Sequence, residues 1–506
     1  MVKVEGLRQD YVLRRRSDRQ WRVIGARHMV GMFNVEHTLY IYNLNAIWMN
    51  FEEIREVLDN QRKFFATGKT LQTGYRIKVL KKMRSLILEY EPQIKEALWK
   101  DFHKPEFEVV ATETRFVIKE LNLAIRKLRR WSSPRRVWTP IVHFIASSRV
   151  VPQPYGQVLV LSPWNYPLQL SMVPVIGALA AGNCVVLKVS QQVPHTNAVM
   201  KRIIDAFPPE LIMLLNGDHT VSEQLLNHRF DYIFFTGSCK IGRYVMEKAA
   251  VNLIPVSLEL GGKNPCIVTA DARLDFAARR IVWGKFMNAG QTCICPDYLM
   301  IDRKVKDHFM ELLKKEIITS FGAEPEKSPD FARIINSNNV SRLVTMMKSG
   351  EIVTGGRAVP EDCFVSPTVL ADVKPGDAVM EEEVFGPVLP VIDFVDFNEV
   401  YEIIEQHPKP LAVYIFTSNK KVAKEFLSKT QSGTAAVNDT VIQIASPYLP
   451  YGGVGCSGLG KYHGKGSFKT FSNMRAVVYK SNLIDFPIRY PPYTKLKTII
   501  LGLLMR

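Results

Sequence analysis

The chain has 506 residues, of which 47% are hydrophobic and 23% are charged, the composition of an ordinary folded protein with room for two or three domains. The formal net charge of +17 fits an anionic ligand or surface, but no nucleic-acid-binding motif accompanies it, so we expect no nucleic-acid partner. No apolar run is long enough to span a bilayer as a helix.

Residues 1–48 differ from the segment that follows them. They combine a run of three arginines with scattered aromatic residues, show no sustained hydrophobic period and lack the continuous apolar core of a signal peptide. From Met49 the sequence changes to the pattern of an amphipathic helix. We therefore expect the folded protein to begin at Met49, with residues 1–48 as a disordered extension or a misassigned start.

Residues 49–131 have the hydrophobic period of helices, including one long helix from about Ile77 to Trp99. Pro134 and Pro140 then interrupt the chain before an apolar, β-branched stretch at 141–151. The first helical part of the chain is therefore expected to end near residue 131.

A regular alternation of strands and helices follows. Near-continuous apolar strands separated by helices indicate a parallel sheet covered on both faces, and such a sheet binds ligands at the carboxyl ends of its strands. A second α/β stretch runs from 262 to about 430, and the chain beyond it is rich in Gly and Pro. The predicted strands are 157–161, 183–188, 212–215, 231–236 and 255–260, with helices at 167–181, from about 195 and from about 240.

Two segments at predicted strand ends are candidates for ligand contacts. The run 236–242, Thr-Gly-Ser-Cys-Lys-Ile-Gly, combines glycines with a helix N-terminus, which suits an anion but also fits an ordinary strand-to-helix turn. Two prolines at 163 and 167 clamp a loop that contains Asn165, whose amide suits either an oxyanion donor or a structural Asx turn.

Two other glycine-rich spacings are rejected as phosphate sites. Residues 453–458 match G-x-G-x-x-G, but they do not follow an apolar strand. Residues 455–461 have the spacing of a P-loop, but Tyr462 stands where the metal-binding Ser or Thr belongs.

Cys293 and Glu259 are the candidate reactive residues. Cys293 ends the run Asn-Ala-Gly-Gln-Thr-Cys, and a cysteine in a tight glycine-containing loop can present a nucleophilic thiolate. Glu259 follows an apolar run and precedes Leu-Gly-Gly. A charged residue is unusual at such a position unless it has a function. Taken alone, however, such a cysteine is more often a small buried hydrophobe, and such a glutamate is more often a strand end or a cap.

The cysteine content argues against a disulfide framework. The number is odd and the residues are scattered through apolar surroundings, which indicates a reducing, cytoplasmic location. Cys293 and Cys295 have no second Cys or His pair at ligand spacing nearby, so no metal site is expected. The seven cysteines lie at positions 184, 239, 266, 293, 295, 363 and 456.

Together these segments resemble the aldehyde dehydrogenase superfamily, and more closely its class 3 branch of fatty and aromatic aldehyde dehydrogenases. The resemblance extends from about Met49 to Tyr493. It implies an α/β fold with a Rossmann-like cofactor domain, an α/β catalytic domain and a small β bridging or oligomerisation element. The motifs that carry it lie at 163–167, 235–238, 258–263, 288–293, 382–387, 449–455 and 462–465.

The resemblance also implies domain boundaries. The segments 49–131 and 152–260 correspond to the NAD(P)-binding domain, and 261–430 corresponds to the catalytic domain. The bridging element corresponds to 132–151 and 431–490, and residues 491–506 form a basic, apolar C-terminal tail.

By the same resemblance, Cys293 attacks the aldehyde carbonyl, and the Asn165 amide with the Cys293 backbone N–H holds the oxyanion. Hydride then passes to the nicotinamide and leaves a thioester on Cys293. Glu259 activates the water that hydrolyses this thioester to a carboxylic acid, a division of labour consistent with the reactivity of thiohemiacetals and thioesters.

For the cofactor, NAD or NADP, the family implies contacts from Trp164 and Lys188 and ribose contacts from Glu383 near Phe385. Its pyrophosphate seat corresponds to Gly237, Ser238 and Gly242. Where the family commonly has Lys-Pro-Ser-Glu, residues 188–191 read Lys-Val-Ser-Gln. Because Gln191 does not repel a 2′-phosphate, we expect NADP to be tolerated alongside NAD.

Cys295 is a second departure, since the class 3 pattern often has Ala there. A reversible protection of oxidised Cys293 is one interpretation, but cysteines at i and i+2 rarely bridge without strain. We favour a buried spectator.

Three functions are compared. An NAD(P)-dependent aldehyde dehydrogenase that produces acids is favoured; a CoA-acylating enzyme would not need Glu259, and a non-catalytic cofactor-binding scaffold would not need Cys293, Glu259 and Asn165. The branch implies medium- to long-chain aliphatic or aromatic aldehydes and a homodimer. The tail at 499–505, preceded by Lys495 and Lys497, is a candidate for peripheral membrane contact or for a docked or frayed helix.

Overall fold

The computed structural model describes residues 2–3, 12–16, 20–24 and 51–505. The chain divides into two compact units, Met1–Trp48 and Met49–Arg506. In the first unit, three short strands pair antiparallel in the order β1-β2-β3: β1 (Val2–Lys3), β2 (Val12–Arg16) and β3 (Gln20–Ile24). The other residues of 1–48 lie outside the described residues. That residues 1–48 form a disordered extension or a misassigned start therefore stays a prediction.

The first large sheet has six strands in the order β20-β10-β9-β6-β7-β8. Five of them run parallel, as the apolar runs predict, and the edge strand β20 pairs antiparallel with β10. The strands are β6 (Gln157–Leu161), β7 (Cys184–Lys188), β8 (Ile212–Leu215), β9 (Tyr232–Thr236), β10 (Val256–Glu259) and β20 (Gly458–Leu459).

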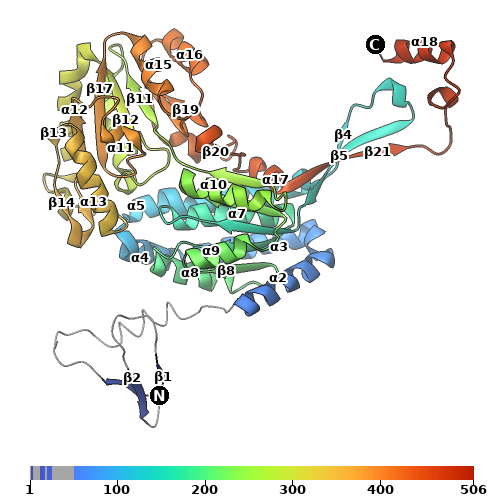
Figure 1. Cartoon of the computed structure of the whole chain (residues 1–506), viewed down its shortest axis with the longest axis horizontal. Coiled ribbons are helices and arrows are strands. Elements are labelled where there is room, and N and C mark those ends of the chain that lie inside the picture. Colours follow the sequence, from blue (N-terminus) through green and yellow to red (C-terminus); the bar gives the residue numbers. More distant parts are fainter. Residues whose placement is uncertain (1, 4–11, 17–19, 25–50, 506) are drawn as a thin grey trace. The chain divides into compact units, whose positions relative to one another are not determined.

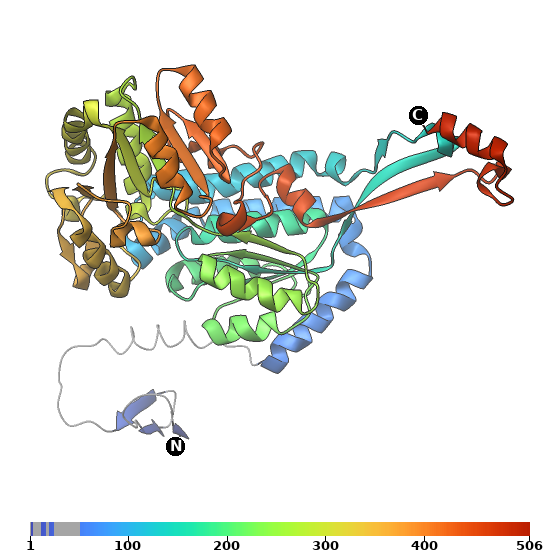
Figure 2. The ribbon, with the colours of Figure 1, turned by 45° about the horizontal axis from the view of Figure 1, so that its top comes forward.

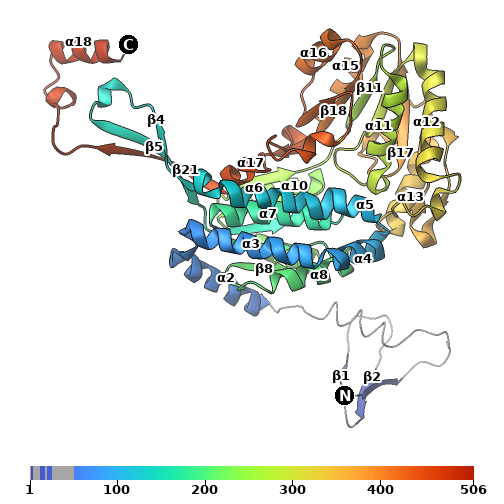
Figure 3. The same cartoon turned by 180° about the vertical axis from the view of Figure 1, so that it is seen from behind.

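Both faces of this sheet are buried, because successive residues of each strand enter different hydrophobic clusters. In β6, Val158 and Val160 pack with the helices of one face, whereas Leu159 and Leu161 pack with those of the other. The first face carries α3 (Thr73–Glu89), α6 (Arg115–Ser132), α7 (Pro167–Ala181) and α8 (Pro194–Ile204), and the second carries α2 (Phe51–Ala66), α9 (His219–Leu226) and α10 (Cys239–Ala250) (Figures 1 and 3).

The predicted single helix from Ile77 to Trp99 is two helices, α3 and α4 (Glu91–Phe102), which meet at Tyr90. The break has a local cause. Pro92 lies in the first turn of α4, where its missing N–H is tolerated, but its ring would collide with the preceding turn of a continuous helix. After α5 (Glu106–Val109), a π-helical turn at Val110–Thr114 leads into α6.

The second large sheet has seven strands in the order β13-β16-β17-β12-β11-β18-β19, and only the edge strand β13 is antiparallel to its neighbour. This confirms a second α/β stretch after Gly262. The strands are β11 (Pro265–Val268), β12 (Tyr298–Asp302), β13 (Glu351–Thr354), β16 (Thr368–Ala371), β17 (Val388–Phe394), β18 (Ala412–Phe416) and β19 (Thr434–Val437). Its helices are α11 (Leu274–Phe286), α12 (Lys306–Phe321), α13 (Ser337–Met346), α14 (Ala378–Glu381), α15 (Phe397–Glu405) and α16 (Lys420–Lys429), and β14 (Ala358–Val359) pairs with β15 (Phe364–Val365).

A three-stranded antiparallel sheet extends away from the two larger sheets, with α18 (Lys495–Leu504) beyond its far end (Figure 2). It consists of β4 (Arg135–Val137), β5 (Ala146–Pro154) and β21 (Ser472–Lys480), and β21 pairs with β5 along its whole length. We call this sheet the arm. The arm includes part of the segment 132–151 where a bridging element is expected, and that bridging role stays a prediction. Residues 141–143 form a 3-10 turn.

The predicted bridging segment 431–490 differs from the structure in one respect. Only β21 enters the arm, because β19 pairs with β18 and β20 pairs with β10 in the two larger sheets. The short α17 (Lys465–Thr470) joins β20 to β21 and packs on α7. Among the described residues, no helix is both long and apolar enough to cross a membrane.

Candidate active site

Cys293 lies in a loop of unusual backbone geometry. The loop follows α11, and three consecutive residues before it are left-handed: Asn288 at φ 56°, Ala289 at φ 50° and Gly290 at φ 74°. A side chain at Gly290 would overlap the carbonyl group of Gly386, so only glycine fits there. The loop therefore packs tightly against the 382–387 motif, which leaves the Cys293 side chain half-buried.

Asn165, at the carboxyl end of β6, joins this loop through a small network of amide groups. Its Nδ2 donates to the carbonyl of Gln291 at 3.1 Å, and its own carbonyl accepts from Asn288 Nδ2 at 3.0 Å. Gln291 is tied in turn to the carbonyl of Arg333, 2.9 Å from its Nε2. The structure thus brings the predicted Asn165 next to the loop of Cys293. Asn165 and its partner Gln291 in that loop are 126 positions apart in the chain.

Glu259 ends β10 and is only 3% exposed. Neither carboxylate oxygen has a hydrogen-bond partner among the described residues. Burial raises the pKa of this carboxyl well above its usual value, and the nearby Lys461 ammonium opposes the shift. Gly452 lies between the two side chains: a Cβ there would sit 2.7 Å from Glu259 Oε1 and 3.1 Å from Lys461 Cδ.

Tyr451 is a site residue that was not predicted from the sequence. Its hydroxyl lies 3.5 Å from Cys293 Sγ. Burial raises the pKa of the Cys293 thiol to about 12; the Tyr451 hydrogen bond lowers it, and the carboxylates of Glu383 and Glu259 raise it further. Tyr451 belongs to the matched motif 449–455, which was the only sequence signal for it.

Beneath the loop lies a buried ion pair. Lys104 and Glu113 are both fully buried, 2.9 Å apart, and the Lys104 ammonium lies 3.7 Å from the centroid of the Tyr166 ring. The Tyr166 hydroxyl is hydrogen-bonded to Thr292 Oγ1 at 2.6 Å. The ion pair therefore supports the residue that precedes Cys293 in the chain.

Cys293 also lines a pocket of about 210 Å³. The π-helical turn contributes Ala111 and Thr112 to the lining, and the loop of the nucleophile contributes Thr292 and Cys293 itself. Most of the remaining wall is apolar and includes Phe116, Leu170, Trp283, Met287, Ile442 and Ile444. An apolar compound with one reactive polar group suits this pocket.

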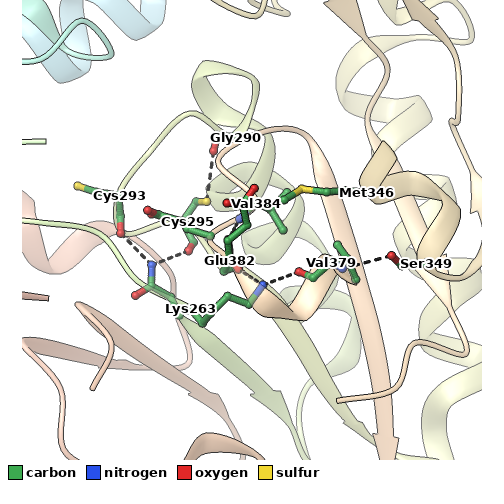
Figure 4. A network of polar contacts seen from close by, with 12 residues as sticks. Lys263, Gly290, Cys293, Cys295, Met346, Ser349, Val379, Glu382 and Val384 are labelled. Carbon is green, nitrogen blue, oxygen red and sulfur yellow. Dashed lines mark hydrogen bonds and ion pairs between the residues drawn. The ribbon is translucent and has the colours of Figure 1, made fainter. Parts of the chain in front are cut away.

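Cys295 faces away from the pocket. It is 2% exposed, its sulfur lies 3.4 Å from the carbonyl oxygen of Gly290, and burial raises its pKa to about 12. Figure 4 shows the Cys293 sulfur directed away from it. Asn264 Nδ2 fixes the intervening backbone by donating to the carbonyls of Cys293 at 2.8 Å and Cys295 at 3.1 Å.

The predicted pyrophosphate seat lies at the carboxyl end of β9. Ser238 caps α10, its Oγ accepting from Ile241 N at 3.4 Å, and the helix N-terminus leaves further N–H groups without helical partners. Side chains do not fit at the two glycines: a Cβ on Gly237 would sit 2.6 Å from the Phe235 ring, and one on Gly242 would sit 2.6 Å from Leu260. The segment can therefore present bare backbone to an anion.

The other predicted cofactor residues lie around the ends of β6 and β7. The Trp164 and Phe385 rings meet edge to face, 5.6 Å between centroids. Lys188, the last residue of β7, is half-buried, and burial lowers its pKa to about 8. Gln191 is exposed in the turn that follows.

Glu383 lies on the opposite side, where its carboxylate contacts Gly261 and accepts a backbone hydrogen bond from Gly262. Burial raises its pKa to about 8. A parallel sheet with a helix N-terminus at a strand end, a loop thiol and a buried carboxylate together fit a dehydrogenase that uses covalent thiol chemistry.

Comparison with known proteins agrees with this class. The model of the aldehyde dehydrogenase family matches residues 48–477. The 4,4'-diaponeurosporen-aldehyde dehydrogenase of Staphylococcus aureus is 38% identical over 443 residues, which cover 87% of this chain and 96% of the relative. The dimeric NADP-preferring aldehyde dehydrogenase of Canis lupus familiaris is 39% identical over 443 residues, 87% of this chain and 98% of the relative.

A solved structure gives the same result. The substrate-bound state of Staphylococcus aureus AldH superimposes with a TM-score of 0.88 at 38% sequence identity, covering 90% of this chain and 100% of that chain. The chain belongs to the aldehyde dehydrogenase family and is similar over 87–88% of its length to family 3 members of rat and human. It is an NAD- or NADP-dependent aldehyde dehydrogenase.

Proposed function

We propose that Cys293, Glu259 and Asn165 carry out the oxidation of an apolar aldehyde to its carboxylic acid. The observation that carries this proposal is the placement of the Cys293 thiol at the wall of an apolar pocket, with the buried and unpartnered Glu259 electrostatically coupled to it. A carbonyl carbon bound in this pocket lies within reach of the thiolate, while its hydrocarbon part contacts the apolar wall.

In the first step, the Cys293 thiolate forms a bond to the carbonyl carbon, and the carbonyl oxygen takes up the negative charge. The Tyr451 hydroxyl stabilises the thiolate by donating to it. Only one hydrogen-bond partner of Asn165 Nδ2 is present among the described residues, so its second N–H is available to the oxyanion together with the Cys293 backbone N–H. When bound, NAD or NADP accepts the hydride that the tetrahedral carbon releases.

In the second step, Glu259 takes a proton from a water molecule, which attacks the thioester on Cys293. The carbon–sulfur bond breaks, the carboxylic acid leaves and the thiolate is restored. A base that is buried without hydrogen bonds has a raised pKa, which makes it a stronger base for this task near neutral pH.

The residues around the strand ends fit a dinucleotide. Gly237 and Gly242 let the start of α10 pack closely on Phe235 and Leu260, α10 offers its N-terminal N–H groups, and Thr236 Oγ1 is buried without a partner in the described part of the chain. Trp164 and Lys188 would contact the cofactor, and Glu383, near Phe385, would contact a ribose. Because Gln191 carries no negative charge and lies exposed beyond Lys188, NADP is accepted as well as NAD.

The apolar pocket favours medium- to long-chain aliphatic or aromatic aldehydes. The Staphylococcus aureus relative is a 4,4'-diaponeurosporen-aldehyde dehydrogenase, which supports an aldehyde as the substrate here as well.

The arm and the helix α18 each support one further proposal. The connection between strands β4 and β5 of the arm has exposed apolar side chains, Trp138 at 80% and Phe144 at 63%, which would be covered in a homodimer, as the dimeric dog relative suggests. In α18, Leu496, Ile499 and Leu503 are exposed beside Lys495 and Lys497, which suits a peripheral contact with an anionic membrane.

The test is NAD(P)H formation from a panel of aldehydes of increasing chain length, with and without CoA. Cys293→Ala should abolish turnover, whereas Glu259→Gln should retain one burst of hydride transfer and lose steady turnover. Turnover that depends on CoA would favour the acylating alternative, and full steady turnover in Glu259→Gln would rule out the proposed base.

A further inference from the structure

A second, larger pocket adjoins the active site through Lys461 and His463, which lie near Glu259 and Tyr451. It has a volume of about 650 Å³ and is bounded by the C-terminal half of α6, the loop 447–450 and the segment 461–470 that contains α17. It shares no lining residue with the pocket of Cys293. Its volume falls within the range of sites that bind small molecules.

The lining of this pocket is strongly basic. Five cationic side chains contribute to it, and no Asp or Glu does so among the described residues. Lys461 donates to the carbonyls of Gly433 and Gly452. The other four have no ion pair or hydrogen bond to any residue that the structure describes: Lys127, Arg130, Lys465 and Lys469.

The spacing of these cations adds to the positive potential. Lys127 and Arg130 are three positions apart on α6, and Lys465 and Lys469 are four positions apart on α17, so each pair lies on one helix face. Like charges at these spacings repel each other. An anion between the two helices would offset this repulsion, since every cation in the lining could then face an opposite charge.

The remaining wall is mostly apolar and partly aromatic, and it also includes His463, Gly466 and Thr470. Leu123, Trp131, Pro447 and Pro450 line it together with Tyr448. Trp131 is half-buried and its ring packs near Phe468, 5.8 Å between centroids, so it is held in place. Such a wall suits a ring or a hydrocarbon next to the charged group of a ligand.

We propose that this pocket binds an organic phosphate, a molecule with at least one phosphate group on an aromatic or aliphatic body. One carboxylate would neutralise only one of four unpaired cations. A phosphate carries a charge of about −1.5 to −2 with three acceptor oxygens, and Arg130 can hold two of them at once. The inference does not depend on the catalytic roles proposed above.

The test uses the full chain with NADP saturating, so that the cofactor site is filled. The probe is 1-naphthyl phosphate, and 1-naphthol is its uncharged counterpart. Calorimetry should show one site per chain for the phosphate that is lost in the double variant described below. Any binding of the naphthol, which also suits the apolar Cys293 pocket, should be equal in that variant and the wild type. Trp131 should report binding by a change in fluorescence, which Trp131→Phe should remove.

The charge requirement is tested by the double variant Lys127→Ala, Lys469→Ala. Its affinity for 1-naphthyl phosphate should fall by at least about tenfold, since two charge-assisted contacts are lost. Lys424→Ala is the matched control, because Lys424 is an exposed lysine of α16 away from the pocket. NADP binding should be unchanged in all variants, which shows that they are folded.

Two sources of phosphate are distinguished by parallel titrations with vesicles of phosphatidylcholine, with and without phosphatidic acid. Binding of the soluble probe assigns the site to a free organic phosphate. Binding of the phosphatidic acid vesicles alone, abolished in the double variant, assigns it to a lipid headgroup. Equal affinity of the double variant and the wild type for every probe, or no binding of any probe, would overturn the proposal.

Discussion

The Tyr451 hydroxyl lies 3.5 Å from the Cys293 sulfur, although the two residues are 158 positions apart. Tyr451 is held by its backbone pairing with Tyr462, 2.8 and 3.1 Å, and by stacking of its ring on His463. Because a donated hydrogen bond stabilises the thiolate more than the thiol, this contact lowers the pKa that burial raises.

Tyr451→Phe should therefore make Cys293 less reactive. Without the hydroxyl the thiol pKa rises, and we expect the rate of alkylation by iodoacetamide at neutral pH to fall about tenfold, the usual worth of a hydrogen bond to a charged group. The measurement is mass-spectrometric labelling of Cys293 across a pH series. Tyr462→Phe is the control, because the Tyr462 hydroxyl is buried without a partner among the described residues. An identical pH profile for Tyr451→Phe and wild type would contradict the assignment.

Lys461→Met should shift the pH dependence of steady turnover upward. The ammonium opposes the burial that raises the pKa of Glu259, so its removal raises that pKa further. Glu259 is active as a base when it is deprotonated, and the rising limb of the profile therefore moves to higher pH. The other titratable groups that face Glu259 are Cys293, Tyr451 and Tyr462.

The measurement is kcat against pH, with the hydride-transfer burst recorded separately. The burst should change less than the steady rate, because Glu259 acts mainly after hydride transfer. Lys465→Ala removes an exposed lysine four positions away and should leave the profile in place. An unchanged profile in Lys461→Met would show that the lysine does not act on Glu259.

The sheets and the anion seat were predictable because they depend on local patterns. Each parallel strand of the first sheet is a continuous apolar run, and Gly237 and Ser238 follow one of these runs directly. The break at Tyr90 also had a local signal in Pro92, which the helical period around it obscured.

The contacts that tune the site were not predictable in this way. Tyr451 and Lys461 reach Cys293 and Glu259 only after the chain has folded back over more than a hundred residues. Lys104 and Glu113 are charged residues, which composition places at the surface, yet both are fully buried because each neutralises the other. Pairings of this kind depend on tertiary structure.

Lys104→Met should destabilise the protein strongly. It leaves Glu113 buried without its partner, a loss we place at about 3–5 kcal/mol of the free energy of unfolding. The double variant Lys104→Met, Glu113→Leu removes both charges and should recover most of the loss. Urea unfolding measures both. Glu96→Gln breaks the exposed pair with Lys100 and should leave the unfolding midpoint unchanged; an equal effect of Glu96→Gln and Lys104→Met would contradict the role of burial.

Gly290→Ala should reduce both stability and activity. The left-handed backbone alone costs a side chain about 1–2 kcal/mol, and the new methyl group would also collide with the Gly386 carbonyl, which displaces the loop of Cys293. Gly68→Ala is the matched control: Gly68 is left-handed at φ 73° and ψ 2°, and the nearest atom to a Cβ there is Leu71 Cδ1 at 3.9 Å, an ordinary contact, so it isolates the backbone cost. Unfolding and burst amplitude together separate the two effects, and full activity in Gly290→Ala would show that the loop tolerates the displacement.

Gln191→Glu should convert the enzyme toward NAD. The exposed turn after Lys188 would then carry a negative charge where the 2′-phosphate of NADP is expected, and we expect kcat/KM for NADP to fall about tenfold or more through charge repulsion. The kcat/KM for NAD should stay unchanged or rise, because a carboxylate accepts hydrogen bonds from ribose hydroxyls. Steady-state kinetics with both cofactors at one ionic strength measure the ratio. Gln192→Glu places the same charge one position further along the exposed turn and controls for a general effect of charge. If both variants lower the two kcat/KM values equally, Gln191 does not face the adenosine ribose.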